Sequence, residues 1–182
     1  MKENKKNAKK AKGRRAYLND FKLDEKGKYQ YEGLLYQWAG EEEAYRHTLL
    51  ALWGLGVLQM ISVLAAGFVE APGVLKGFYV IFPYIVSLVA SVSVLWGIWR
   101  LTEGKKPLRA YIYKASVAAL PVRTLIVMIS GGISVIGEIY YEVSHGTQGQ
   151  LSLILLFLVL EIIPVICAAL IFKKVQNMPW EL

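Results

Sequence analysis

The sequence predicts an all-α integral membrane protein, built as an antiparallel bundle of four transmembrane helices. Of its 182 residues, 55% are hydrophobic and only 19% are charged, and the mean hydropathy is +0.38. Four apolar stretches each exceed the roughly 20 residues that a helix needs to cross a bilayer. Lipid offers no hydrogen-bond partners and the stretches lack the alternation of barrel strands, so helices are the expected spanning element. The stretches cover residues 47–69, 77–99, 115–137 and 151–172.

The distribution of Lys and Arg predicts that both termini lie in the cytoplasm. The connection 100–114 carries five basic residues against one glutamate, whereas residues 138–150 contain two glutamates and no Lys or Arg. Lys173 and Lys174 open a short C-terminal segment, 173–182, that we also expect in the cytoplasm. We therefore expect a multi-pass protein of the plasma membrane. The short loops and the lysine-rich tail favour a bacterial origin.

Residues 1–16 are predicted to form a disordered basic tail. They hold eight Lys and Arg against one Glu and contain no aromatic residue. Such a tail attracts anionic lipid headgroups, or it serves only to enforce the orientation, and both interpretations stay open. Basic residues alone supply no element that reads bases, so nucleic acid is not an expected partner.

Residues 17–46 are predicted to form an aromatic-rich segment beside the membrane. Alternating aromatic and apolar residues flank the sequence DEKG at 24–27, which indicates a small β-hairpin within 17–32. Three consecutive glutamates, 41–43, have no histidine or cysteine at ligand spacing, so ordinary solvated charge is favoured over a metal site. They also suit the first turn of a helix that continues into the first span, where negative charge complements the helix dipole.

Three strongly polar side chains interrupt the apolar stretches: Gln59, Arg123 and Glu161. At 1.5 Å per residue, they lie about 12 to 16 Å from the cytoplasmic ends of their predicted spans, and hence in one layer. An unpaired charge at this depth costs roughly 2.5 to 3.5 kcal/mol, so such residues usually face the interior and pair. We therefore predict an ion pair between Arg123 and Glu161, with Gln59 satisfying the remaining donors or acceptors.

Prolines and small residues also mark the spans. Each proline inside a helix removes one N–H and frees the carbonyl four residues earlier, which predicts free carbonyls at Val117 and Leu160 beside the two charges. These carbonyls belong either to a cation or proton site or to simple helix kinks. Small residues allow helices to approach closely. The predicted kinks are at Pro83, Pro121 and Pro164, and the predicted packing residues are Ser87, Ser91, Ser130, Ser134 and Gly137.

Two functions remain compatible with the sequence. It contains no nucleotide-binding glycine loop, no metal-ligand constellation and no nucleophile with a base, so we expect neither an enzyme nor a cofactor. The first expectation is an accessory or assembly subunit of a larger membrane complex, because a minimal transporter would not need the long N-terminal segment. The second is an oligomeric transporter or channel, coupled to ions or protons through Glu161. An arginine close to that carboxylate would disfavour cation binding, which places the second function below the first.

Overall fold

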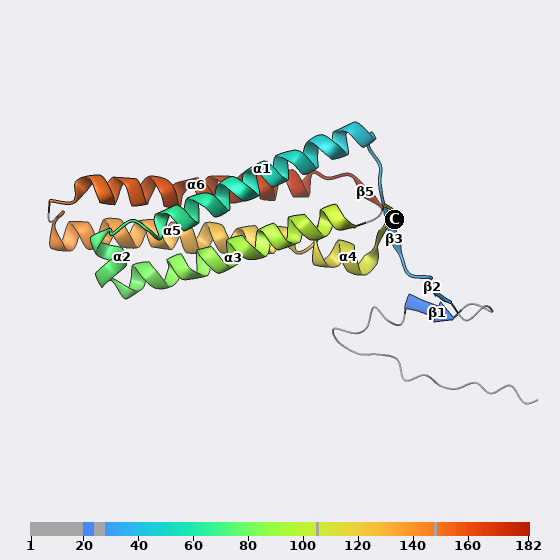
Figure 1. The fold of residues 1–182 in the computed structure, drawn as a ribbon, viewed down its shortest axis with the longest axis horizontal. Helices are drawn as coiled ribbons and strands as arrows, with labels where there is room; N and C mark the ends of the chain where they lie inside the picture. Colours follow the sequence, from blue (N-terminus) through green and yellow to red (C-terminus); the bar gives the residue numbers. More distant parts are fainter. Residues whose placement is uncertain (1–19, 24–27, 105, 148) are drawn as a thin grey trace, which may run out of the picture.

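Four long helices form an antiparallel bundle in the computed structural model, which describes residues 20–23, 28–104, 106–147 and 149–182 (Figure 1). Each helix is long and apolar enough to cross a membrane. Each packs on two neighbours, in the ring order α1, α3, α5, α6. The predicted basic tail 1–16 and the predicted turn 24–27 lie outside the described residues. The long helices are α1 (Glu42–Ala66), α3 (Phe78–Glu103), α5 (Leu120–His145) and α6 (Leu151–Gln176).

The third span begins and ends later than the sequence predicted. A short helix, α4 (Ala110–Ala115), comes first, and α5 starts only at Leu120. Pro121 lies in the first turn of α5, where its missing N–H would have no helical partner in any case. The prediction of a kink inside the helix at Pro121 is therefore wrong, whereas Pro83 and Pro164 do lie inside helices. At the start of the first span, Glu42 and Glu43 form the first turn of α1, as their charge favours.

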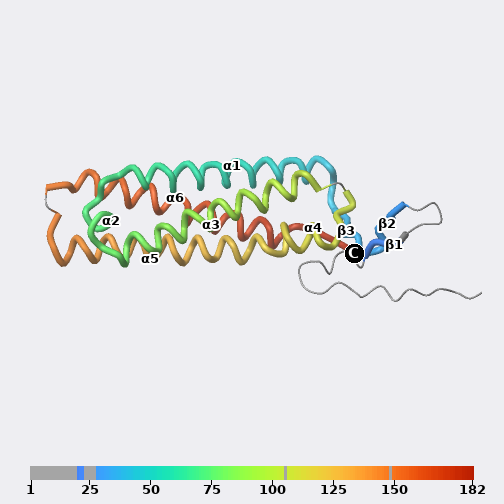
Figure 2. Tube along the Cα trace, turned by 60° about the horizontal axis from the view of Figure 1, so that its bottom comes forward, coloured from blue at the N-terminus to red at the C-terminus, as the bar shows by residue number. Residues whose placement is uncertain are grey.

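A three-stranded sheet, which we call the cap, closes one end of the bundle. Its central strand β3 (Leu35–Trp38) lies between β4 (Leu108–Arg109) and β5 (Trp180–Glu181), antiparallel to both. The cap thus joins the segment before α1, the connection between α3 and α5, and the C-terminal residues (Figure 2). The all-α prediction missed it, because strands of two to four residues are too short to show a period.

Aromatic rings hold the cap to the helices. Trp180 makes edge-to-face contacts with Trp38, Tyr45 and Tyr113, at ring-centroid distances of 5.5, 6.1 and 6.0 Å. Tyr36 stacks on Tyr113 at 3.9 Å. Aromatic pairs contribute about 0.5 to 1.5 kcal/mol each beyond the area that they bury. The cluster therefore fixes the C-terminal residues against β3 and the start of α1.

A pair of strands projects beyond the cap (Figure 1). β1 (Phe21–Leu23) and β2 (Tyr29–Tyr31) are antiparallel, with Phe21 opposite Tyr31. The Tyr31 hydroxyl donates to the Leu34 carbonyl at 3.2 Å and accepts from the Ala110 N–H at 3.1 Å. Burial raises the pKa of the Tyr31 hydroxyl, so it keeps the proton that it donates. Tyr31 thus connects the strand pair to the cap.

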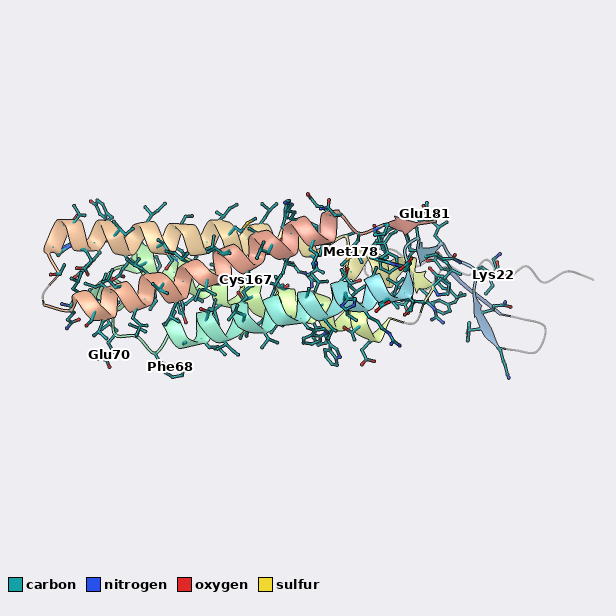
Figure 3. The ribbon with its side chains drawn as sticks, turned by 90° about the horizontal axis from the view of Figure 1, so that it is seen from above. Lys22, Phe68, Glu70, Cys167, Met178 and Glu181 are labelled. Atoms are coloured by element: carbon teal, nitrogen blue, oxygen red, sulfur yellow. The ribbon has the colours of Figure 1, made fainter. Side chains whose placement is uncertain are left out.

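The opposite end of the bundle holds the connections between α1 and α3 and between α5 and α6. Figure 3 shows Phe68 and Glu70 at this end, and Lys22 and Glu181 at the cap end. The short helix α2 (Pro72–Lys76) lies here and packs on α3 and α5. The connections between α1 and α3 and between α5 and α6 therefore lie at one end of the bundle. The basic connection 100–114 lies at the other end, together with the C-terminus.

The glycine at position 131 sets the distance between α5 and α6. A Cβ atom there would lie 2.9 Å from Cγ2 of Val165, whereas a Cβ at the adjacent Gly132 would meet nothing within 4 Å. Gly131→Leu should therefore lower the free energy of unfolding by about 1 to 3 kcal/mol through overpacking. Gly132→Leu, the matched control, should change it little. Thermal unfolding of both variants in the same detergent checks this, and equal losses would contradict the observed packing of α5 on α6.

Candidate functional site

A layer of buried polar side chains crosses the middle of the bundle. It separates an apolar cluster near the cap, which includes Leu52 and Ile98, from a second cluster, which includes Val63 and Phe157. All four helices contribute buried polar side chains to this region, and Gly131 of α5 lies beside them. The buried polar residues are Gln59 and Ser62 from α1, Ser87 and Ser91 from α3, Ser130 and Ser134 from α5, and Glu161 from α6.

Glu161 is fully buried in this layer. Gly131 lies beside its carboxyl group, since a Cβ at that position would be in van der Waals contact with Oε1 of Glu161, at 3.5 Å, and with Oγ of Ser87, at 3.6 Å. The Ser87 hydroxyl is thus close to the carboxyl group and interacts with it, although no hydrogen bond of good geometry joins them. Among the described residues, this carboxyl group forms no ion pair, which is an unusual setting for a buried glutamate.

Hydrogen bonds between helices satisfy other groups of the layer. Nε2 of Gln59 donates to Oγ of Ser91 at 3.0 Å. Oγ of Ser62 donates at 2.8 Å to the carbonyl of Leu160, which Pro164 leaves without its helical partner. The free carbonyl predicted at Leu160 is thus present, and a serine that the sequence analysis did not single out binds it.

The predicted small residues of α5 pack differently from one another. Ser134 donates across the interface to the Val80 carbonyl at 3.4 Å. A Cβ at Gly137 would lie 3.2 Å from the Tyr79 carbonyl, which Pro83 frees, so this glycine lets α5 approach the first turn of α3. Ser130 instead donates within its own helix, to the Ile126 carbonyl at 2.7 Å.

The predicted ion pair between Arg123 and Glu161 is not formed. No ion pair of the described part of the chain joins them. Arg123 donates instead to the carbonyls of Ser93, at 2.7 Å, and Ala115, at 3.3 Å. The cause is the late start of α5, which puts Arg123 only three residues into that helix. Glu161 contacts the region of Gly131, about 12 Å further along the same helix.

Arg123 does not bind the carbonyl that was predicted beside it. Val117 precedes α5 rather than lying inside it. Of the two carbonyls that bind the guanidinium, one belongs to Ala115, the last residue of α4, and the other to Ser93 on α3. The break between α4 and α5, and not a proline kink, thus supplies the first of these acceptors.

Glu138 is a buried polar residue that the sequence analysis assigned to a loop. Because α5 continues to His145, Glu138 lies inside the helix and is fully buried. Its Oε1 accepts the backbone N–H of Gly73 at 3.1 Å, and a side chain on Gly73 would occupy the same space. The burial of Glu138 could have been predicted from the sequence, because Glu138 follows Ser134 by four residues and Gly131 by seven and therefore shares their helix face.

The chain matches no family model, no curated protein and no solved structure. Among the residues that the structure describes, no group of three or more His, Cys, Asp and Glu side chains is arranged to hold a metal ion. What the middle of the bundle offers chemically is one carboxyl group beside a hydroxyl, in surroundings that favour a neutral, protonated acid over a bare anion.

We predict that Arg123 and Glu161 contribute independently to stability. In a double-mutant cycle, the effects of Arg123→Leu and Glu161→Leu on the free energy of unfolding should add to within about 0.3 kcal/mol, because the two side chains share no contact. The control cycle, Gln59→Leu with Ser91→Ala, should give a coupling of about 0.6 kcal/mol, typical of hydrogen bonds between membrane helices. Reversible unfolding in bicelles measures both. A coupling above about 1 kcal/mol between positions 123 and 161 would contradict the geometry described above.

Proposed function

We propose that the protein is an accessory or assembly subunit of a larger membrane complex, which docks through the strand pair β1–β2 beyond the cap. The observation that carries this proposal is the arrangement of the N-terminal segment: its strand β3 is the centre of the cap, whereas its strands β1 and β2 extend beyond the cap. A bundle of four helices needs no such extension for its own stability. By the distribution of basic residues, the cap end faces the cytoplasm, and we propose the plasma membrane of a bacterium as its location.

The contacts of the strand pair favour a fixed orientation for docking. Phe21 packs edge-to-face on Tyr31 at 5.3 Å, and the Arg109 guanidinium lies 5.3 Å from the Tyr31 ring. A cation near an aromatic face contributes about 0.5 to 1 kcal/mol at exposed sites. These contacts attach β2 to the connection that carries β4, so the pair has a defined direction relative to the bundle.

The exposed side of this region supports an extended segment of a membrane partner as the occupant. Tyr29 is 76% exposed and Leu34 is 62% exposed. Isolated two-stranded sheets are only marginally stable, and β1 and β2 pair with no other described strand. Addition of a partner's strand would satisfy a free edge and cover the two apolar side chains. Neighbouring cationic groups, such as the exposed Arg109, favour a segment with acidic residues.

Affinity purification of the tagged chain from its native host, in mild detergent, tests the proposal. We expect a stoichiometric membrane partner, and we expect Tyr29→Ser with Leu34→Ser to reduce its recovery at least fivefold, because these side chains would lie in the interface. Phe68→Ser is the matched control, since Phe68 is 87% exposed at the opposite end. Recovery of a pure homo-oligomer, or equal loss with the control, would reject this function.

A second function, an oligomeric ion- or proton-coupled small-molecule transporter or channel, is favoured by the surroundings of Glu161. The objection that an arginine lies beside the carboxylate no longer holds, because Arg123 binds two carbonyls elsewhere. A buried acid without a counter-ion is neutral because it keeps its proton, and it releases that proton when water gains access. Pro83 interrupts the hydrogen bonding of α3, which carries Ser87, and Pro164 interrupts that of α6, which carries Glu161. These two helices are therefore the ones expected to move.

Proton flux into vesicles that contain the purified chain distinguishes this function from the first. If Glu161 carries the proton, Glu161→Gln should abolish pH-driven flux, because the amide cannot release a proton in the accessible range. Glu138→Gln is the control, since it changes another buried carboxyl group on a different helix. Flux in Glu161→Gln equal to that of the unmodified chain would exclude the role, as would the absence of flux in every preparation.

A further inference from the structure

The positive charge of Arg123 has no acidic partner among the described residues. Its two hydrogen bonds go to the carbonyls of Ser93 and Ala115, which carry partial charges only. A guanidinium has five N–H donors, so these two bonds leave donors for a further acceptor. Intramembrane cations pair with other charged groups or with backbone carbonyls, and in this bundle Arg123 binds carbonyls only. Its unused donors therefore remain for an anion from outside the bundle.

A groove between α3 and α5 begins at this guanidinium. It has a volume of about 350 Å³, and Arg123 and Ser93 are the lining residues nearest the cap on α5 and α3. The rest of the lining is apolar, and it includes Val86, Val89 and Ile126. Val89 is 64% exposed, so the groove opens on the surface that faces lipid. A hydrocarbon chain fits such a lining, whereas a free inorganic anion would gain nothing from it.

A second cation lies on the cap side of the groove. Arg100 follows Ser93 by seven residues, which puts it on the same face of α3 and about 10 Å nearer the cap. Arg100 is exposed, and its charge repels that of Arg123. A phosphate group between the two guanidinium groups would replace this repulsion with attraction, because planar guanidinium groups bind phosphate through paired hydrogen bonds.

We propose that this groove binds one anionic phospholipid, with the phosphate between Arg100 and Arg123 and one acyl chain along Val86, Val89 and Ile126. The site is separate from both proposed functions, which involve the projecting strands and Glu161. It also differs from attraction of lipid to the basic tail, because it combines a charge inside the apolar zone with an apolar groove. If the cap end is cytoplasmic, the lipid belongs to the leaflet in which anionic lipids are concentrated.

Photo-crosslinking of the full chain in phosphatidylcholine vesicles tests the site. A trace of phosphatidylglycerol with a diazirine on its acyl chain should label peptides that contain residues 85–93 or Ile126 more strongly than phosphatidylcholine with the same chain. Arg100→Gln should lower this difference about fivefold, the factor expected for one basic residue near the surface. Arg123→Gln should do the same. Because Arg100 is exposed, its variant provides the test even if Arg123→Gln does not fold.

Two further variants separate the site from general electrostatic attraction. Lys174→Gln removes one charge at the same end but from α6, and it should leave the labelling of residues 85–93 unchanged. Ile126→Trp fills the groove while both arginines remain, and it should reduce the labelling. Equal labelling by the two lipids would overturn the proposal, as would full labelling in Arg100→Gln.

Discussion

A polar group inside the hydrocarbon region has no water to bond with, and this constraint accounts for the hydrogen bonds between the helices. Pro164 frees the Leu160 carbonyl, and Ser62 on the neighbouring helix donates to it. Tyr84, the residue after Pro83, donates to the Val63 carbonyl at 2.9 Å. The buried Gln59 finds Ser91 on α3. Each of these three bonds ties two helices together.

Small residues let the remaining helix, α5, pack closely on its neighbours. Gly131 and Gly137 allow α5 to approach α6 and α3 so closely that a methyl group at either position would press on its neighbours. The polar layer also fixes the register, since a shift of α1 by one turn would separate Gln59 from Ser91 and bury both without partners. Loss of such a bond leaves a desolvated group, which costs about 1 to 3 kcal/mol. Packing and polar pairing therefore select the same arrangement.

Arg123, which is half-buried, and Glu161, which is fully buried, show how the same constraint produces different surroundings. Arg123 lies in the first turn of α5, where the break after α4 offers a carbonyl and where its long side chain reaches α3. Glu161 lies about 12 Å further along the bundle, among Ser87 and glycine. The arginine therefore remains cationic near one end, and the glutamate is best accommodated with its proton. This separation leaves each charge available for a role of its own.

The sequence by itself determined the four helices, their antiparallel order and the burial of Gln59, Ser87, Ser91 and Glu161. Hydropathy and helical period depend only on neighbours along the chain, and the cost of polar groups in lipid directs those residues inward. The same reasoning anticipated the free carbonyl at Leu160, because a proline acts on its own helix. It could not find the cap, whose strands of two to four residues become strands only when distant segments meet.

Tertiary structure alone decided which polar residues pair. The proposed contact of Arg123 with Glu161 depended on where the third helix begins, and a shift of five residues, from 115 to 120, moved the arginine about 8 Å along the bundle. The same shift buried Glu138, which the sequence had assigned to a loop. Helix limits are set by packing, capping and connections as well as by local preference. A pairing between helices is therefore decided by the three-dimensional fit of their ends, which no local pattern in the sequence specifies.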